Sequence, residues 1–179
     1  MSNGKPRVIA TRHFPPDVEA RLAANFDAQL NPDDRLYDGP ALARVSAGFD
    51  AIMCAAGDAL NAATIAALPA SVRMIATFSV GYEHVDVAAA ARRNIVVSNT
   101  PDVLTEPTAD FGFALMMATA RRMAEGEHFL RSGQWTRWSY DMFTGSDVHG
   151  ATLGILGMGR IGQAIARRGA LGFGMQVIY

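Results

Sequence analysis

The sequence predicts an α/β protein built on a parallel, doubly wound sheet. Between residues 7 and 98, short runs rich in valine and isoleucine alternate with alanine- and leucine-rich segments, and parallel neighbouring strands need such crossover helices. A glycine-rich segment, GMGRIG at 157–162, follows an apolar run and precedes a helical pattern. The 179 residues are 50% hydrophobic and 18% charged, as expected of a chain that folds around a packed core.

The region before residue 100 is expected to form one domain, residues 1–99. Its strands are predicted from β-branched and apolar runs, and its helices from helical spacing, from proline at the first turn and from the N-cap residue Asp86. The predicted strands are 7–11, 26–30, 50–54, 74–78 and 95–98. The predicted helices are 15–24, 39–47, 61–68 and 86–93.

A second domain is expected over residues 100–179. The turn sequence NTPD at 99–102 marks a hinge near Thr100, and one long helix is predicted over 106–130, with Pro107 at its start. Residues 131–150 are irregular and contain Trp135, Trp138, Tyr140 and Phe143. These aromatic residues fit a loop folded back on its own domain and, equally, an arm that crosses to a second subunit.

The segment at 157–162 has the form G-x-G-x-x-G in the context that binds dinucleotides. A strand is predicted at 151–156, a helix at 163–171 and a further strand at 175–179. Glycine allows the tight turn, the close approach of backbone to a pyrophosphate and close helix packing. The predicted cofactor-binding residues of the loop are Gly157, Met158, Gly159, Arg160, Ile161 and Gly162. A purely structural turn is the alternative, and the Arg160 side chain either contacts the pyrophosphate or points to solvent.

Composition excludes several classes of function. Sixteen Lys and Arg against 17 Asp and Glu leave a net charge of −1, so no basic field favours nucleic acid. Cys54 is the single cysteine, which excludes an internal disulfide and fits a reducing compartment and a core position. No metal site, signal peptide or membrane span is predicted, and we expect a cytoplasmic protein. We expect no catalytic role for the four histidines, and His84 is expected to stabilise the junction before Asp86.

Three blocks resemble the D-isomer-specific 2-hydroxyacid dehydrogenases: ATFSVGYEHVD at 76–86, NTPDVLTEPTADFGFALMMATARR at 99–122 and GATLGILGMGRIGQAIARR at 150–168. The segments GQWTRW at 133–138 and VLTEPTAD at 103–110 look most like the glyoxylate and hydroxypyruvate reductase branch. The resemblance implies a flavodoxin-like substrate domain over 1–99. It implies the start of a Rossmann NAD(P)-binding domain over 100–179.

The resemblance also implies an activity: reduction of glyoxylate or hydroxypyruvate to the D-2-hydroxy acid with NAD or NADP as cofactor. Val80 and Gly81 match the backbone groups that receive the substrate carboxylate, and Thr105 matches a residue beside the nicotinamide. The family's catalytic arginine, glutamate and histidine match no residue up to Tyr179, so none is assigned here. A homodimer is implied, with contacts through 106–130 and 135–143.

A complete dinucleotide domain has two βαβαβ halves, and residues 100–179 contain little more than one βαβ unit. We therefore expect the 179 residues to be a fragment that is inactive alone, with the residue that selects NAD or NADP beyond Tyr179. The alternative is a non-catalytic module for nucleotide sensing or dimerisation, because a fold does not fix a function.

Overall fold

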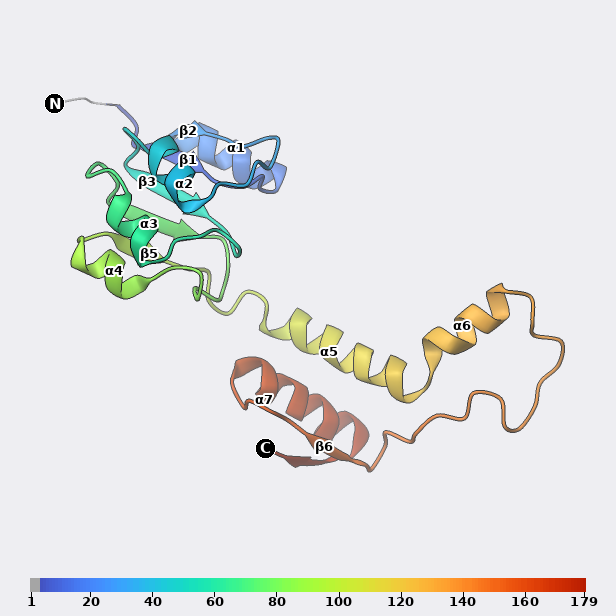
Figure 1. Ribbon diagram of the computed structural model, residues 1–179. Helices are drawn as coiled ribbons and strands as arrows, with labels where there is room; N and C mark the ends of the chain where they lie inside the picture. The colour runs from blue at the N-terminus through green and yellow to red at the C-terminus, as the bar shows by residue number, and fades with distance from the viewer. Residues whose placement is uncertain (1–3) are drawn as a thin grey trace. The chain divides into compact units, whose positions relative to one another are not determined.

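The computed structural model describes residues 4–179 and divides into two compact units, Met1–Asp102 and Val103–Tyr179. Each unit has its own parallel sheet (Figure 1). The first domain expected from the sequence starts at Met1, so its first three residues lie outside the described part. The division falls after Asp102 rather than after Asn99, and Thr100 donates its backbone N–H to the Ser79 carbonyl of the first unit at 3.0 Å.

The first unit is a five-stranded parallel sheet with the order β2-β1-β3-β4-β5. This is the order of a flavodoxin-like, doubly wound sheet, so the predicted fold class is confirmed. The strands are β1 (Arg7–Ala10), β2 (Asp27–Gln29), β3 (Ala51–Cys54), β4 (Met74–Thr77) and β5 (Val96–Ser98). The helices are α1 (Pro16–Asn25), α2 (Gly39–Val45), α3 (Ala62–Ala67) and α4 (Val87–Arg92).

The core of this unit lies between the sheet and the row of helices α2, α3 and α4, in which α3 packs against both neighbours. The register aligns Ile9, Ile52, Ile75 and Val97 across four strands, and the three isoleucines are fully buried or nearly so. Side chains two residues apart share a face of a strand. Thr77 therefore lies on the helix-covered face, two residues beyond Ile75, at the carboxyl end of β4.

Polar caps start the three helices of this row. The side chains of Asp38, Asn61 and Asp86 each accept a backbone N–H three residues further on, at 2.8, 3.0 and 2.8 Å. Such caps satisfy N–H groups that have no partner inside the helix. The predicted N-cap role of Asp86 is confirmed.

The second unit contains a two-stranded parallel sheet and the helices around it. The elements are α5 (Thr105–Ala120), α6 (Met123–Arg131), β6 (Thr152–Gly154), α7 (Arg160–Arg167), the π-helical turn η1 (Arg168–Gly172) and β7 (Gln176–Ile178). Strands β6 and β7 pair in parallel, and α7 and η1 connect them. Together they form one βαβ unit. Helix α5 packs on α7, and Arg168, the first residue of η1, binds the carboxylates of Glu106 and Asp110 at 2.8 and 2.5 Å.

The prediction of one long helix over 106–130 is wrong, because the helix breaks at Arg121 and Arg122. Arg122 adopts a left-handed conformation with φ +52°. The Ala120 carbonyl accepts the backbone N–H of Ser146 at 2.8 Å instead of continuing the helix. Gly145 lies so close that a Cβ there would come within 2.2 Å of the Ala120 oxygen. Helix α5 therefore ends at Ala120, because the Ser146 N–H of the returning segment binds the carbonyl oxygen at this end of the helix.

Candidate functional site

The predicted carboxylate-binding residues, Val80 and Gly81, lie in the loop after β4. This loop is at the carboxyl edge of the sheet, where open α/β sheets bind ligands. Hydrogen bonds hold three successive carbonyl groups of the loop. Ser79 O accepts the Thr100 N–H at 3.0 Å, Val80 O accepts the Asn99 side-chain amide at 2.8 Å, and Gly81 O accepts the Ser79 hydroxyl at 2.7 Å.

Fixing these carbonyl groups also fixes the N–H groups of the loop. In a trans peptide the N–H points away from the C=O of the same plane, and there are no cis peptides in residues 4–179. The bond to Ser79 O thus orients the Val80 N–H, and the bond to Val80 O orients the Gly81 N–H. In the described part of the chain neither N–H has a hydrogen-bond acceptor. Two adjacent backbone donors of this kind can bind an anion.

One negative charge lies beside these donors. A Cβ added to Gly81 would come within 2.5 Å of Glu83 Oε2, so the Glu83 carboxylate lies against the Gly81 α-carbon. Because Glu83 is exposed, its side chain can turn away when another carboxylate binds. It nevertheless opposes an anion through like-charge repulsion.

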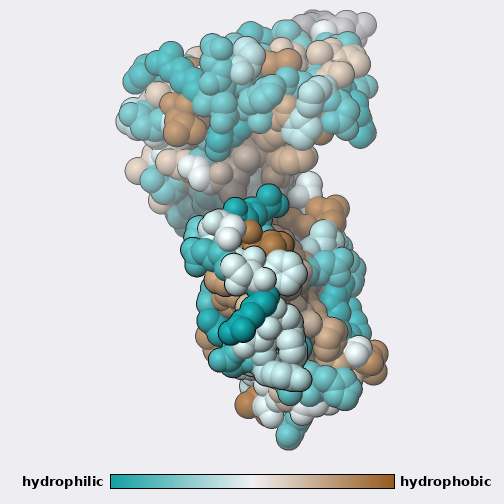
Figure 2. Space-filling model, turned by 90° about the vertical axis from the view of Figure 1, so that its right-hand side faces the viewer, coloured by the Kyte–Doolittle hydropathy of each residue, from teal (hydrophilic) through white to brown (hydrophobic). Residues whose placement is uncertain are grey.

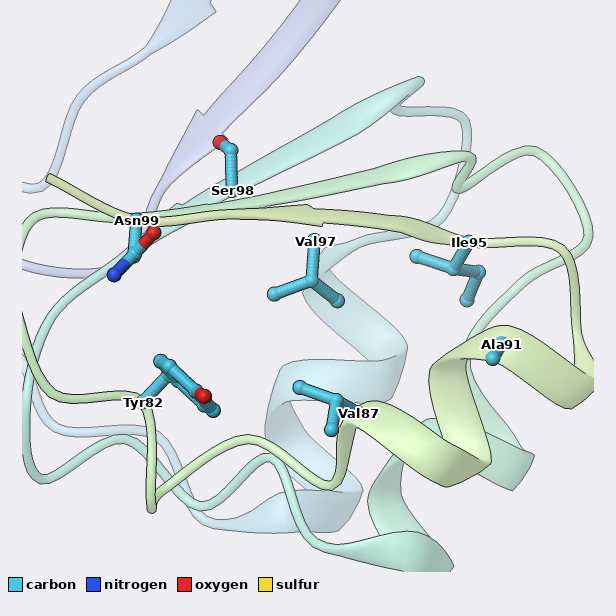
Figure 3. A pocket seen from close by; sticks show the side chains of 7 residues that line it. All are labelled: Tyr82, Val87, Ala91, Ile95, Val97, Ser98 and Asn99. Carbon is cyan, nitrogen blue, oxygen red and sulfur yellow. The ribbon is translucent and has the colours of Figure 1, made fainter. Parts of the chain in front are cut away.

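A hollow of about 300 Å³ lies next to this loop, between β5 and α4. Val97 and Val87 face each other across it, and Tyr82 and Asn99 lie at its end (Figure 3). The remaining lining residues are Ala91, Ile95 and Ser98. The lining is mainly apolar and contains no carboxylate or histidine, so the hollow offers packing rather than acid–base chemistry.

The glycine-rich loop in the second unit has the geometry of a tight turn into α7. Gly157 has φ +98°, which favours glycine. A Cβ on Gly162 would come within 2.1 Å of the Gly157 carbonyl oxygen, whereas a Cβ on Gly159 would meet nothing within 4 Å. Gly162 thus allows the turn to close on the helix, and Gly159 leaves open space in front of the backbone.

The amino-terminal end of α7 is available to an anion. The helix has Gly159 as its N-cap and no side-chain cap. The Gln163 N–H donates to Gly159 O at 2.9 Å, while the N–H groups of Ile161 and Gly162 have no acceptor among residues 4–179. Free N–H groups and the positive end of the helix dipole favour phosphate. The loop therefore fits the pyrophosphate of a dinucleotide.

The helix after the loop starts earlier than predicted. It begins at Arg160 rather than Gln163, so Arg160, Ile161 and Gly162 form its first turn. Met158 precedes this turn, and its carbonyl accepts the Gln163 side-chain amide at 3.0 Å. The loop residues predicted from the sequence are thus brought together at one helix end.

Thr105 is the first residue of α5 and is half-buried. It precedes Glu106, whose carboxylate binds Arg167 at 3.2 Å and Arg168 at 2.8 Å. Through the packing of α5 on α7, Thr105 and the glycine-rich loop belong to one unit. Val80 and Gly81 belong to the other.

Two other residues of the first unit, Cys54 and His84, lie in environments that indicate structural roles. Cys54 is fully buried, and burial raises the pKa of its thiol to about 12, with the Thr77 hydroxyl opposing part of the rise. A thiol in this state is a core residue and not a nucleophile. The His84 ring, two residues before the cap Asp86, contacts Thr77 Oγ1 at the end of β4 at 2.9 Å.

The aromatic segment of the second unit, residues 131–150, is partly folded back on its own unit. The Phe143 ring packs on Phe129 of α6 at 5.2 Å between centroids. Trp135, Trp138 and Tyr140 remain 51%, 64% and 89% exposed. Figure 2 views this side of the unit and shows pale and brown side chains at the surface among teal ones. The groove between α6 and this segment is lined almost wholly by apolar side chains.

Residues 4–179 contain neither a metal-binding cluster of side chains nor a membrane-spanning helix. No group of three or more His, Cys, Asp or Glu side chains there has the arrangement of a metal site. No helix in that range combines the length and apolar character needed to span a bilayer.

Sequence reasoning missed three residues that shape the loop: Thr77, Ser79 and Asn99. Thr77 and Asn99 follow the aligned positions Ile75 and Val97 by two residues on neighbouring strands. Adjacent parallel strands bring such positions to one edge. Polar residues at the ends of two successive predicted strands were the available signal.

Comparison with known proteins agrees with these features. Residues 8–156 match the family model described as D-isomer specific 2-hydroxyacid dehydrogenase, catalytic domain. A glyoxylate reductase of Thermococcus kodakarensis is 42% identical over an alignment of 179 positions that covers 98% of this chain and 53% of the relative. A glyoxylate reductase of Korarchaeum cryptofilum is 43% identical over 98% of this chain and 52% of its own. The chain thus spans about half the length of the curated relatives it matches.

Solved structures show the same likeness. A D-isomer specific 2-hydroxyacid dehydrogenase from Polaromonas, described as NAD-binding, has a TM-score of 0.86 at 37% identity, over 97% of this chain and 54% of that one. An NADPH-dependent glyoxylate/hydroxypyruvate reductase from Sinorhizobium meliloti, in complex with NADP and malonate, has a TM-score of 0.80 at 36% identity. That match covers 98% of this chain and 53% of the other.

Proposed function

The chain belongs to the family of D-isomer specific 2-hydroxyacid dehydrogenases, and we propose that the protein containing it reduces a small 2-oxo acid with NADH or NADPH. Glyoxylate or hydroxypyruvate is the proposed substrate, and the D-2-hydroxy acid is the product. The names of the relatives support this choice, since several are glyoxylate reductases and one is a glyoxylate/hydroxypyruvate reductase.

The first unit is assigned to substrate binding. The proposed contacts are the N–H groups of Val80 and Gly81, which receive the substrate carboxylate. Their support is the pair of hydrogen bonds to the Ser79 and Val80 carbonyls, which fixes the two peptide planes that carry these N–H groups. Backbone donors held in this way need no rearrangement when an anion binds, which lowers the cost of binding.

The second unit is assigned to the cofactor. The single observation that carries this assignment is the approach of Gly162 to the Gly157 carbonyl, which leaves no room for a side chain. The proposed pyrophosphate contacts are backbone groups of Gly157, Met158, Gly159, Arg160, Ile161 and Gly162. Thr105 is proposed to lie on the nicotinamide side. When bound, NADH or NADPH supplies the hydride; the residues of this chain bind and orient.

A homodimer is part of the proposal. Its support is the apolar surface on α5 and on the segment after α6, where Phe111, Leu115, Trp135, Trp138 and Tyr140 are each more than half exposed. Contiguous exposed apolar surface marks an interaction site. Light scattering at micromolar concentration is expected to give twice the monomer mass, and a monomer would contradict this part. A cytoplasmic location is also proposed, from the single buried thiol.

An activity assay tests the proposed function. The protein purified from its own gene is mixed with NADH or NADPH and with glyoxylate, hydroxypyruvate or pyruvate, and absorbance at the nicotinamide band is followed. We expect oxidation of the nucleotide with at least one 2-oxo acid. Binding of nucleotide without any turnover would contradict the proposal and favour a nucleotide-sensing module.

A further inference from the structure

Four polar groups form a continuous line from the helix junction to the carboxylate loop. His84 Nε2 lies 2.9 Å from Thr77 Oγ1, and Thr77 Oγ1 lies 2.7 Å from Ser79 Oγ. Ser79 Oγ lies 2.7 Å from the Gly81 carbonyl oxygen. Thr77, at the centre of the line, is 3% exposed. The other members of the line, His84, Ser79 and Gly81, are half-buried.

The direction of every hydrogen bond in this line follows from counting protons. A hydroxyl has one proton, and a carbonyl oxygen can only accept. Ser79 therefore gives its proton to Gly81 O, so in its contact with Thr77 it must accept. Thr77 thus gives its only proton to Ser79 and must accept from His84. The Nε2 atom of His84 must carry a hydrogen, whether the ring is neutral or charged.

We propose that His84, Thr77 and Ser79 are positioning residues for carboxylate recognition, acting as a one-way chain from His84 Nε2–H to Gly81 O. The proposal rests on the proposed role of Val80 and Gly81. The chain holds the Gly81 carbonyl beneath the loop, next to the carbonyls that Thr100 and Asn99 hold. Hydrogen bonds in series strengthen one another, and this chain restrains the peptide plane that follows Gly81, next to the two planes that carry the Val80 and Gly81 N–H groups.

The tautomer of His84 is the first test, because a histidine that merely filled space would not require one tautomer. The 179-residue chain is labelled with 15N-histidine, and the chemical shifts of both ring nitrogens are read at a pH where the ring is neutral. His84→Gln identifies the signals by their loss. We expect the Nε2–H tautomer in the wild-type chain. The Nδ1–H tautomer would overturn the proposal.

Carboxylate binding is the second test, with sodium glycolate as the probe and sodium chloride at equal ionic strength as the reference. Backbone amide shifts of Val80 and Gly81 report binding. Thr77→Val removes the acceptor of His84, so the tautomers should mix and glycolate affinity should fall roughly three- to tenfold. Ser79→Ala removes the acceptor of the Thr77 proton, so Thr77 is free to donate to His84 instead; the tautomers should again mix and the affinity should fall.

Two further variants complete the design. His84→Gln retains a side-chain N–H donor and should keep glycolate affinity within about twofold of wild type. Ser98→Ala removes a nearby hydroxyl that takes no part in these hydrogen bonds, so it should change neither the His84 tautomer nor the glycolate affinity. Wild-type affinity in both Thr77→Val and Ser79→Ala would overturn the positioning role and leave the carboxylate site standing. Absence of any glycolate response in the wild-type chain would overturn both.

Discussion

Asn99 donates its side-chain amide to the carbonyl oxygen of Val80 at 2.8 Å, joining the end of β5 to the loop after β4. The two residues are 19 positions apart in sequence. Because the Val80 carbonyl and the Gly81 N–H share one peptide plane, this bond determines where the Gly81 N–H points. A side chain with no assigned contact to substrate thus orients a backbone group that is proposed to bind it.

Replacing Asn99 by alanine should weaken carboxylate binding. The Val80 carbonyl loses its donor and the peptide can turn, which we expect to lower glycolate affinity roughly tenfold. Amide shifts or calorimetry with the 179-residue chain measure the change. Asn25→Ala is the matched control, since the Asn25 amide donates to the Arg21 carbonyl of its own helix, away from the loop. Equal affinity in both variants would contradict the role of Asn99.

Two alanine substitutions in the glycine-rich loop should separate folding from cofactor binding. Gly162→Ala forces a methyl group to within 2.1 Å of the Gly157 carbonyl oxygen. We expect the free energy of unfolding to fall by about 1–3 kcal/mol and nucleotide binding to be lost as well. Gly159→Ala adds a methyl group in open space at φ −73°. It should unfold at the wild-type temperature yet bind NADH and NADPH more weakly.

Thermal unfolding and fluorescence titration with each reduced nucleotide provide the two readouts. Gly126→Ala is a suitable control, because a Cβ there meets nothing within 4 Å and the residue is in α6. If Gly159→Ala binds both nucleotides as tightly as wild type, the space in front of Gly159 does not accept the pyrophosphate.

Neutralising Glu83 should strengthen carboxylate binding. The Glu83 carboxylate lies against Gly81 and repels an incoming anion. Glu83→Gln keeps the size of the side chain and removes the charge, so we expect glycolate affinity to rise roughly two- to fivefold at low salt. The gain should shrink as salt screens the charge. An affinity that falls, or a gain that is independent of salt, would contradict this reading of Glu83.

The stability of the first unit should depend on Asp34 at acid pH. The Arg12 guanidinium, 2.7 Å from the carboxylate, and the His13 N–H lower the pKa of Asp34 well below its usual value of 3.8. A depressed pKa in the folded state stabilises the fold above the unfolded pKa, and this contribution is lost as pH falls below about 3.8. Asp34→Asn should therefore be less stable than wild type at neutral pH.

Denaturation as a function of pH measures this effect. The difference in free energy of unfolding between wild type and Asp34→Asn should narrow as the solution is acidified below the pKa that Asp34 has in the unfolded chain. Asparagine tolerates the left-handed backbone at this position, where φ is +47°, so the substitution tests the charge. Asp33→Asn changes the neighbouring residue and should leave the pH profile as in wild type. A constant difference down to strongly acid pH would rule out the ion pair as its cause.

The order of strands and helices in the first unit could be predicted because local patterns and the fold agree. Runs such as RVIA and MIAT became β1 and β4, and Asp86 caps α4 as its position before an alanine run indicates. The glycine-rich loop could likewise be predicted, because its chemistry depends on backbone and therefore on where glycine occurs. These features need only neighbours in sequence.

The features that sequence reasoning missed depend on distant neighbours. Nothing in the run ATARRMAEG indicates a break, since arginine and alanine favour helix; the break comes from Gly145 and Ser146 against Ala120. Asn99 likewise was expected as a turn residue. Its contact with Val80 exists only because β4 and β5 pair in parallel and end at the same edge.

We propose that the two units bind different ligands, the substrate carboxylate at Val80 and Gly81 and the dinucleotide at residues 157–162. The most direct measurement is a pair of titrations of the 15N-labelled 179-residue chain, one with glycolate and one with NADH or NADPH, read by backbone amide shifts. We expect glycolate to move the amide signals of Val80 and Gly81, and the nucleotide to move those of residues 157–162. Nucleotide shifts that avoid residues 157–162, or glycolate shifts that avoid Val80 and Gly81, would contradict this proposal.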